Sequence, residues 1–135
     1  MRMRSLLCSL VAAAALPVCA SAQSSGPVYE LRTYTTVEGR LDALLARFRD
    51  HTTKLFEKHG MKNVGYWVPA DEPRSKNTLI YILRHESREA AKKSWDAFRK
   101  DPDWIKARTA SETSGKIVEK VESVYLTPTA FSALK

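Results

Sequence analysis

Three polar side chains of different chemistry alternate in one short, β-prone segment. Glu30, Arg32 and Tyr34 are spaced two residues apart within residues 28–34, so in a strand they share one face. If this is the sheet face that no helix covers, and that face becomes the interior of a barrel, the carboxylate, guanidinium and phenol project into the interior and could orient an anionic or phenolic ligand. In the simpler explanation, Glu30 and Arg32 pair with each other or with a second subunit and only satisfy a polar interface. We favour this explanation, because most ion pairs with no nucleophile or metal beside them are structural.

Three further side chains join this set as candidates for ligand binding. Trp67 would form an aromatic wall if it alternates with Tyr66 onto the sheet face, although a place in the core is the simpler prediction for it. His85, at the end of a strand that contains Tyr81, points either into a cavity beside Tyr81 or toward solvent. The sequence assigns no catalytic residue. The ligand-binding candidates are Glu30, Arg32, Tyr34, Trp67, Tyr81 and His85.

Motifs for metals, cofactors and covalent catalysis are not found. The chain has three histidines, and His51 and His59 are eight residues apart, whereas helices that bind metals commonly space them by four. Both cysteines, Cys8 and Cys19, lie in the first 22 residues. There is no Ser-His-Asp arrangement and no Gly-rich phosphate loop. We therefore expect no metal and no cofactor, and neither a hydrolase nor a nucleotide-binding protein.

The first 22 residues have the three parts of a secretory signal peptide. Arg2 and Arg4 precede an apolar run over 6–16, and Ala20-Ser21-Ala22 supplies small residues for cleavage before Gln23. The apolar run is shorter than the roughly 20 residues that a membrane span needs. A lipoprotein acylated at Cys19 is the remaining alternative, but Val18 is branched where such signals favour a small residue.

The expected mature chain is a periplasmic or secreted domain over 28–135, which follows a polar linker over 23–27. It has no thiol and no membrane span. The whole chain of 135 residues is 44% hydrophobic and 27% charged, which is typical of one globular domain. Its net charge is +7, but basic and acidic residues alternate, as at Arg47, Arg49 and Asp50. This mixture indicates solvated helix faces and not a nucleic-acid surface.

Hydrophobic periodicity predicts the elements that position these side chains. Period-two segments predict strands, the i, i+3, i+4 rhythm predicts helices, and Gly60, Ser87 and Asp101-Pro102 supply helix ends or starts. Trp95 is expected in the core, while Trp104 packs on the broken helix or closes one mouth of a cavity. The predicted strands cover 28–34, 64–68, 78–85 and 116–126, and the predicted helices cover 40–59 and 87–100, with a short helix from 102.

This order predicts an α+β, ferredoxin-like βαββαβ fold with a four-stranded antiparallel sheet. Right-handed crossovers place both helices on one face of the sheet and leave the other face without cover from its own chain. An RNA-recognition motif would carry stacking aromatics on its central strands, but residues 78–85 contain only Tyr81. We therefore expect the open face to contact protein, and we expect no nucleic acid.

Several short motifs in this order resemble the NIPSNAP family. They are Tyr29-Glu30-Leu31-Arg32 with Tyr34, Gly65-Tyr66-Trp67, Trp95-Asp96-Ala97-Phe98, Asp101-Pro102-Asp103-Trp104, and Leu126-Thr127-Pro128-Thr129 with Phe131-Ser132. The sequence departs from the family at Glu38-Gly39, where Pro-Gly is usual, and at Asp103, where Glu is common. The resemblance covers nearly the whole mature chain and implies a dimeric α/β barrel, in which two such subunits press their sheets together.

The resemblance implies no settled reaction. We expect a homodimer through the sheet face that encloses a cavity for a small, partly apolar molecule. A cofactor-independent monooxygenase or isomerase, in which Arg32, Tyr34, Tyr81 and His85 position the substrate, is an alternative by analogy with related barrels. A purely structural or interaction protein is another. Whether the chain is an enzyme stays open.

Overall fold

The structure is a computed structural model that describes residues 26–135. The predicted signal peptide over 1–22 and most of the linker over 23–27 lie outside these residues. The elements are β1 (Val28–Thr36), α1 (Leu41–Arg47), a π-helical segment (Phe48–Thr52), α2 (Thr53–Lys58), β2 (Lys62–Trp67), a short 3-10 turn (Arg74–Lys76), β3 (Thr78–His85), α3 (Arg88–Lys100), α4 (Pro102–Ser111) and β4 (Val118–Leu126).

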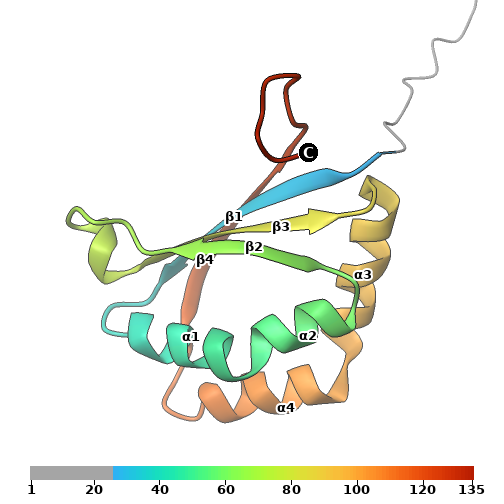
Figure 1. Cartoon of the computed structure of the whole chain (residues 1–135). Helices are drawn as coiled ribbons and strands as arrows, with labels where there is room; N and C mark the ends of the chain where they lie inside the picture. The colour runs from blue at the N-terminus through green and yellow to red at the C-terminus, as the bar shows by residue number, and fades with distance from the viewer. Residues whose placement is uncertain (1–25) are drawn as a thin grey trace, which may run out of the picture.

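The four strands form one antiparallel sheet in the order β2-β3-β1-β4. The helices lie on one side of this sheet, and the other side carries only the C-terminal segment (Figure 1). This arrangement confirms the predicted α+β fold with its four-stranded antiparallel sheet. Strands β1 and β3 lie at the centre of the sheet, while β2 and β4 form its two edges. Side chains on β4 are therefore nearer to solvent than those on its neighbour β1.

The first helical region is continuous but not uniform. The predicted helix over 40–59 is present as α1 and α2, joined by the π-helical turn Phe48–Thr52. The Thr52 hydroxyl donates to the carbonyl oxygen of Arg47 at 3.2 Å, five residues earlier, and this bond spans the wider turn. Periodicity over 18 residues cannot reveal one inserted π turn, because the apolar positions on either side keep their helical spacing.

The second helical region begins and breaks where the sequence predicts. Ser87 caps α3 by accepting a hydrogen bond from the Ala90 backbone N–H at 3.0 Å. Asp101 caps α4 in the same way through Asp103 N–H at 2.8 Å, and Pro102 takes the first helical position. The other Asp101 oxygen lies 2.7 Å from His59 Nε2 and 2.8 Å from Lys58 Nζ. Asp101 therefore joins the end of α2 to the start of α4.

The bounds of three strands differ from the prediction. Strand β1 continues to Thr36, two residues beyond its predicted end. Strand β2 is Lys62–Trp67 instead of 64–68, and its pairing with β3 shifts between Asn63 and Gly65, which leaves Val64 as the extra residue of a bulge. Strand β4 begins at Val118 and not at 116, because the Ile117 carbonyl instead accepts a hydrogen bond from the backbone N–H of Val37. Strand β3 has the predicted bounds.

The core between sheet and helices is an aromatic cluster. Tyr81 is fully buried at its centre, with its ring 5.2 Å from Phe48, 5.3 Å from Tyr66 and 5.4 Å from Tyr34. Such edge and offset contacts stabilise a core beyond the area they bury. Leu44, Met61, Leu79, Leu83 and Ile117 complete this cluster.

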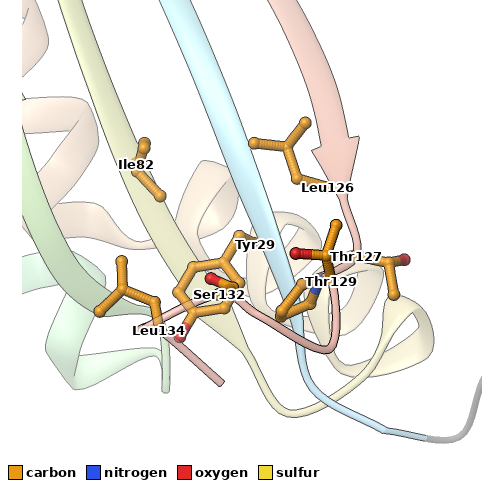
Figure 2. Close-up of a pocket in the computed structure, with 8 residues that line it drawn as sticks. Tyr29, Ile82, Leu126, Thr127, Thr129, Ser132 and Leu134 are labelled. Carbon is orange, nitrogen blue, oxygen red and sulfur yellow. The ribbon is translucent and has the colours of Figure 1, made fainter.

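The C-terminal segment after β4 folds back across the open side of the sheet (Figure 1). The Tyr29 hydroxyl donates to the Lys135 carbonyl oxygen at 2.9 Å. Figure 2 shows Ser132 and Leu134 of this segment beside Tyr29, where they border a shallow pocket of about 330 Å³. The pocket is lined mostly by apolar groups and offers no charged side chain, so it has little chemistry for selecting a ligand.

Candidate functional site

Strand β1 presents its polar residues to the helices and not to the open face. Glu30, Arg32 and Tyr34 all contact side chains of the helix layer or of the core beneath it. The prediction that these three project from the open sheet face is therefore wrong. Their neighbours Tyr29 and Leu31 lie on the open face instead. Strand alternation defines two faces, but it does not tell which of them the helices cover.

Glu30 is the hub of a buried polar network and is only 1% exposed. One carboxylate oxygen accepts hydrogen bonds from the Trp95 indole at 2.7 Å and from His85 Nε2 at 2.8 Å. The other accepts from Arg32 at 2.7 Å and from the Ser123 hydroxyl at 2.7 Å. Four donors use all the lone-pair directions of a carboxylate. Glu30 therefore pairs with Arg32, as the simpler explanation requires, and has no further capacity for a ligand.

These hydrogen bonds determine the charge of Glu30. Burial by itself raises the pKa of this carboxyl, but the hydrogen bonds from His85, Ser123, Trp95 and Arg32 outweigh it, and the pKa falls from 4.5 to about 2. The carboxylate is thus ionised at neutral pH. Because an ionised carboxylate only accepts hydrogen bonds, Nε2 of His85 must carry the proton that it donates.

The remaining predicted candidates are dispersed. His85 is 1% exposed beside Glu30, and so is not a strand-end residue near solvent. Tyr81 lies in the aromatic core, where burial raises the pKa of its phenol well above 10. Trp67 alone is on the open face, 51% exposed, so the prediction that it lies in the core is wrong. The structure thus unites Glu30, Arg32 and His85 in one network and separates Trp67 from them.

A cleft of about 380 Å³ opens between strands β1 and β4 and helices α3 and α4. Arg32 and Tyr34 form part of its sheet side. Its aromatic walls come from Trp95, Phe98 and Trp104, and the rings of Phe98 and Trp104 lie 4.6 Å apart. Five basic and two acidic side chains also line it, namely Arg32, Arg47, Arg99, Arg108, Lys116, Glu112 and Glu119. The cleft therefore combines apolar surface with an excess of positive charge.

Arg32 forms the inner floor of this cleft. Its guanidinium stacks 4.2 Å from the centre of the Trp95 ring and 5.6 Å from that of Tyr34. Burial alone lowers the pKa of Arg32, but the neighbouring Tyr34 and Tyr81 and the ion pair with Glu30 outweigh burial and raise the pKa above its usual value. Because Glu30 already compensates the charge of Arg32, the role of Arg32 in the cleft is to position the aromatic side chains that it contacts.

Arg47 is the binding candidate that the residue types do not single out. The alternation of charges places it on a solvated helix face, and this prediction is wrong, because Arg47 is only 4% exposed. Its guanidinium lies 5.3 Å from the centre of the Trp104 ring. One signal was available in the sequence: Arg47 stands three residues after Leu44 and directly before Phe48, within the apolar stripe of the first helix.

Trp104 lies at the mouth of this cleft and is partly buried, so it packs on the broken helix and also borders the cavity. Trp95 is in the core, as predicted, at 6% exposed. Within residues 26–135, no three His, Cys, Asp or Glu side chains cluster closely enough to hold a metal ion. In the same part of the chain, no helix combines the length and apolarity that crossing a membrane requires.

The fold and the position of the cleft define a ferredoxin-like α+β domain with a polar and aromatic pocket between its two layers. The sequence model of NIPSNAP matches residues 29–133. The chain belongs to the NIPSNAP family.

Solved structures of this family share the fold. A NIPSNAP family protein with unknown function from Agrobacterium tumefaciens is 23% identical, with a TM-score of 0.69 over 83% of this chain and 96% of that chain. A second NIPSNAP family protein from the same organism is 21% identical, with a TM-score of 0.69 over 81% and 99% of the two chains. A NIPSNAP-like domain protein from Burkholderia xenovorans is 15% identical, with a TM-score of 0.68 over 80% and 90%. Among curated proteins the comparison finds no match.

Proposed function

We propose that this NIPSNAP domain is a binding module that takes a small, partly apolar molecule into the cleft between its sheet and its helices. The observation that carries the proposal is the composition of the cleft. Three aromatic walls and several cationic side chains converge on about 380 Å³, a volume typical of small-molecule sites. The cleft is already formed by a single chain.

We also propose that the domain is a homodimer through the open sheet face. Leu31 at the centre of this face pairs with Ile82 on one side and Val124 on the other. Val124 is 52% exposed, and Trp67 at the far edge is 51% exposed. Apolar side chains that stay exposed on a sheet face without helices are the kind of surface that a second copy covers in a symmetric pair.

Export to the periplasm or the medium is the third part of the proposal. It rests on the signal-peptide pattern of residues 1–22 alone. Intact mass measurement of the protein recovered from a periplasmic fraction tests it. A chain that begins at Gln23 supports export. A chain that retains Met1, or an acyl group on Cys19, contradicts export with cleavage before Gln23.

The site proposal predicts opposite outcomes for two tryptophan substitutions. We expect Trp104→Ala to weaken the binding of a neutral fluorescent arene, N-phenyl-1-naphthylamine, by about five- to tenfold, because it removes one aromatic wall. The matched variant Trp67→Ala, on the open face, is expected to leave the affinity within about twofold. Fluorescence titration measures both. Loss of binding in Trp67→Ala with no change in Trp104→Ala would place the ligand on the sheet face and contradict the proposal.

A further inference from the structure

Arg47 carries a buried positive charge that its surroundings compensate only in part. Its side chain is 3% exposed, its Nη1 donates to the Ser111 hydroxyl oxygen at 3.2 Å, and its carboxylate partner Glu112 lies 3.4 Å from the same nitrogen. A well-formed guanidinium–carboxylate bond is nearer 2.7 to 2.9 Å, which is the distance between Arg32 and Glu30. Among residues 26–135, Arg47 Nε has no hydrogen-bond partner; the same is true of Arg32 Nε, so the longer distance to its carboxylate is what sets Arg47 apart. A buried charge with so little compensation is costly to the empty domain.

Glu112 also lacks a short ion pair. Its other carboxylate oxygen lies 3.6 Å from Arg108 Nε, so one carboxylate is divided between two guanidiniums at long range. Glu112 is also the C-cap of α4, where the partial negative charge of the helix end disfavours a carboxylate. Its side chain is 25% exposed and lines the mouth of the cleft. Neither its contacts nor its position makes Glu112 a strong structural anchor.

The surroundings of this pair are those of a ligand site. Arg47 stacks near Trp104, Trp104 packs on Phe98, and all of these residues border the same cleft. Burial lowers the pKa of Arg47, and Glu112 only partly offsets this effect. Arginine nevertheless stays charged under all ordinary conditions, so the site presents a fixed cation beside apolar walls.

We propose that Arg47 is the anion-binding residue of the cleft, that the ligand is an aromatic or similarly apolar monocarboxylate, and that Glu112 occupies the place of the ligand carboxylate in the empty domain. The ligand carboxylate displaces Glu112 and takes over Arg47, while its apolar part lies against Trp104 and Phe98. One anionic group suffices, because the other buried guanidinium of the cleft, that of Arg32, already has its carboxylate at 2.7 Å, whereas the carboxylate beside Arg47 lies at 3.4 Å. This inference rests on the proposed function.

Binding of a matched pair of probes tests the inference. 2-Naphthoate and 2-naphthamide share an arene and differ in charge. We expect isothermal titration calorimetry to show that the wild-type domain binds naphthoate about tenfold or more tightly than naphthamide. In Arg47→Met this preference falls to about one, with naphthamide affinity unchanged. In Arg108→Met, which alters an exposed arginine of the same cleft, most of the preference remains.

Substitution of Glu112 gives the opposite sign and identifies its role. We expect Glu112→Gln to raise naphthoate affinity by about fivefold or more, since no internal carboxylate then competes for Arg47. Glu119→Gln, which removes another negative charge from the lining, is expected to raise it by less than about twofold. Equal effects of the two substitutions, or none from Glu112→Gln, would overturn the displacement of Glu112.

Thermal unfolding separates a binding role for Arg47 from a structural one. If Arg47 is retained for a ligand, Arg47→Met keeps or raises the Tm of the empty domain, because an apolar side chain of similar length suits the burial. A large fall in Tm assigns Arg47 to stability and overturns the inference. Different results would overturn the two proposals. Equal binding of both probes to the wild type overturns the carboxylate inference alone. Binding of neither probe at millimolar concentration overturns the cleft as a binding site.

Discussion

The substitution Glu30→Gln is expected to lower the free energy of unfolding by about 3 kcal/mol or more at neutral pH. Four donors converge on the two carboxylate oxygens at 2.7–2.8 Å. A glutamine turns one of these oxygens into a donor group that faces two donors, and it leaves Arg32 with no close counter-ion. In a domain of this size the Tm should fall by about 10 °C or more. Urea unfolding and calorimetry measure both quantities.

The effect of Glu30 should depend on pH in a defined direction. Because folding lowers the pKa of Glu30 from 4.5 to about 2, its stabilisation is fully present above pH 4.5 and is lost as the pH falls toward 2. The difference in unfolding free energy between wild type and Glu30→Gln should therefore be constant above about pH 5 and shrink between pH 4.5 and pH 2. The control is Glu38→Gln, an exposed position where we expect less than about 0.5 kcal/mol. A Glu30→Gln variant as stable as this control would contradict the role of the network.

The second large effect concerns the open sheet face. We expect the wild-type domain to sediment as a dimer at micromolar concentration and Leu31→Lys to sediment as a monomer, with the dimer Kd raised by about a hundredfold or more. Leu31 is central to the face, so a lysine there would carry a charge without a counter-ion into the proposed contact. Sedimentation velocity over a concentration series measures the change.

A matched apolar-to-lysine substitution on the helix side controls for added charge. Ile105 on α4 is 51% exposed and lies in the layer opposite to the open face, so Ile105→Lys should leave the dimer intact. A wild-type domain that sediments as a monomer at micromolar concentration would contradict the dimer. The cleft would remain, because one subunit supplies all of its lining.

Local signals account for the parts of the fold that the sequence predicts. The bounds of β3, the cap at Ser87 and the break at Asp101-Pro102 each depend on a few neighbouring residues with strong conformational preferences, and each is confirmed. The bulge in β2 depends on its pairing with β3, and the π turn after Arg47 keeps the helical spacing of the apolar positions on either side, so periodicity reveals neither.

Local sequence signals predict the candidate site less well than they predict the fold. Glu30 and Arg47 are charged, and burial is exceptional for charged residues. Glu30 is buried because its donors come from distant elements: Trp95 is 65 residues away and Ser123 is 93. Those contacts place Glu30 on the helix-covered face of the sheet, a choice that the alternation in β1 leaves open. Arg47 is buried although it is charged, and only its place within the apolar stripe of the first helix, not the residue composition, indicates this.

The position of a bound arene tests most directly whether the ligand occupies the cleft between the sheet and the helices. Isotope-edited NOE spectra of the labelled domain with 2-naphthoate report contacts between the arene protons and individual side chains. We expect cross-peaks to the indole protons of Trp104 and to the ring of Phe98, which border the helix-side cleft. Cross-peaks confined to Trp67 and to the methyl groups of Leu31 and Ile82 would place the ligand on the open sheet face and contradict the account.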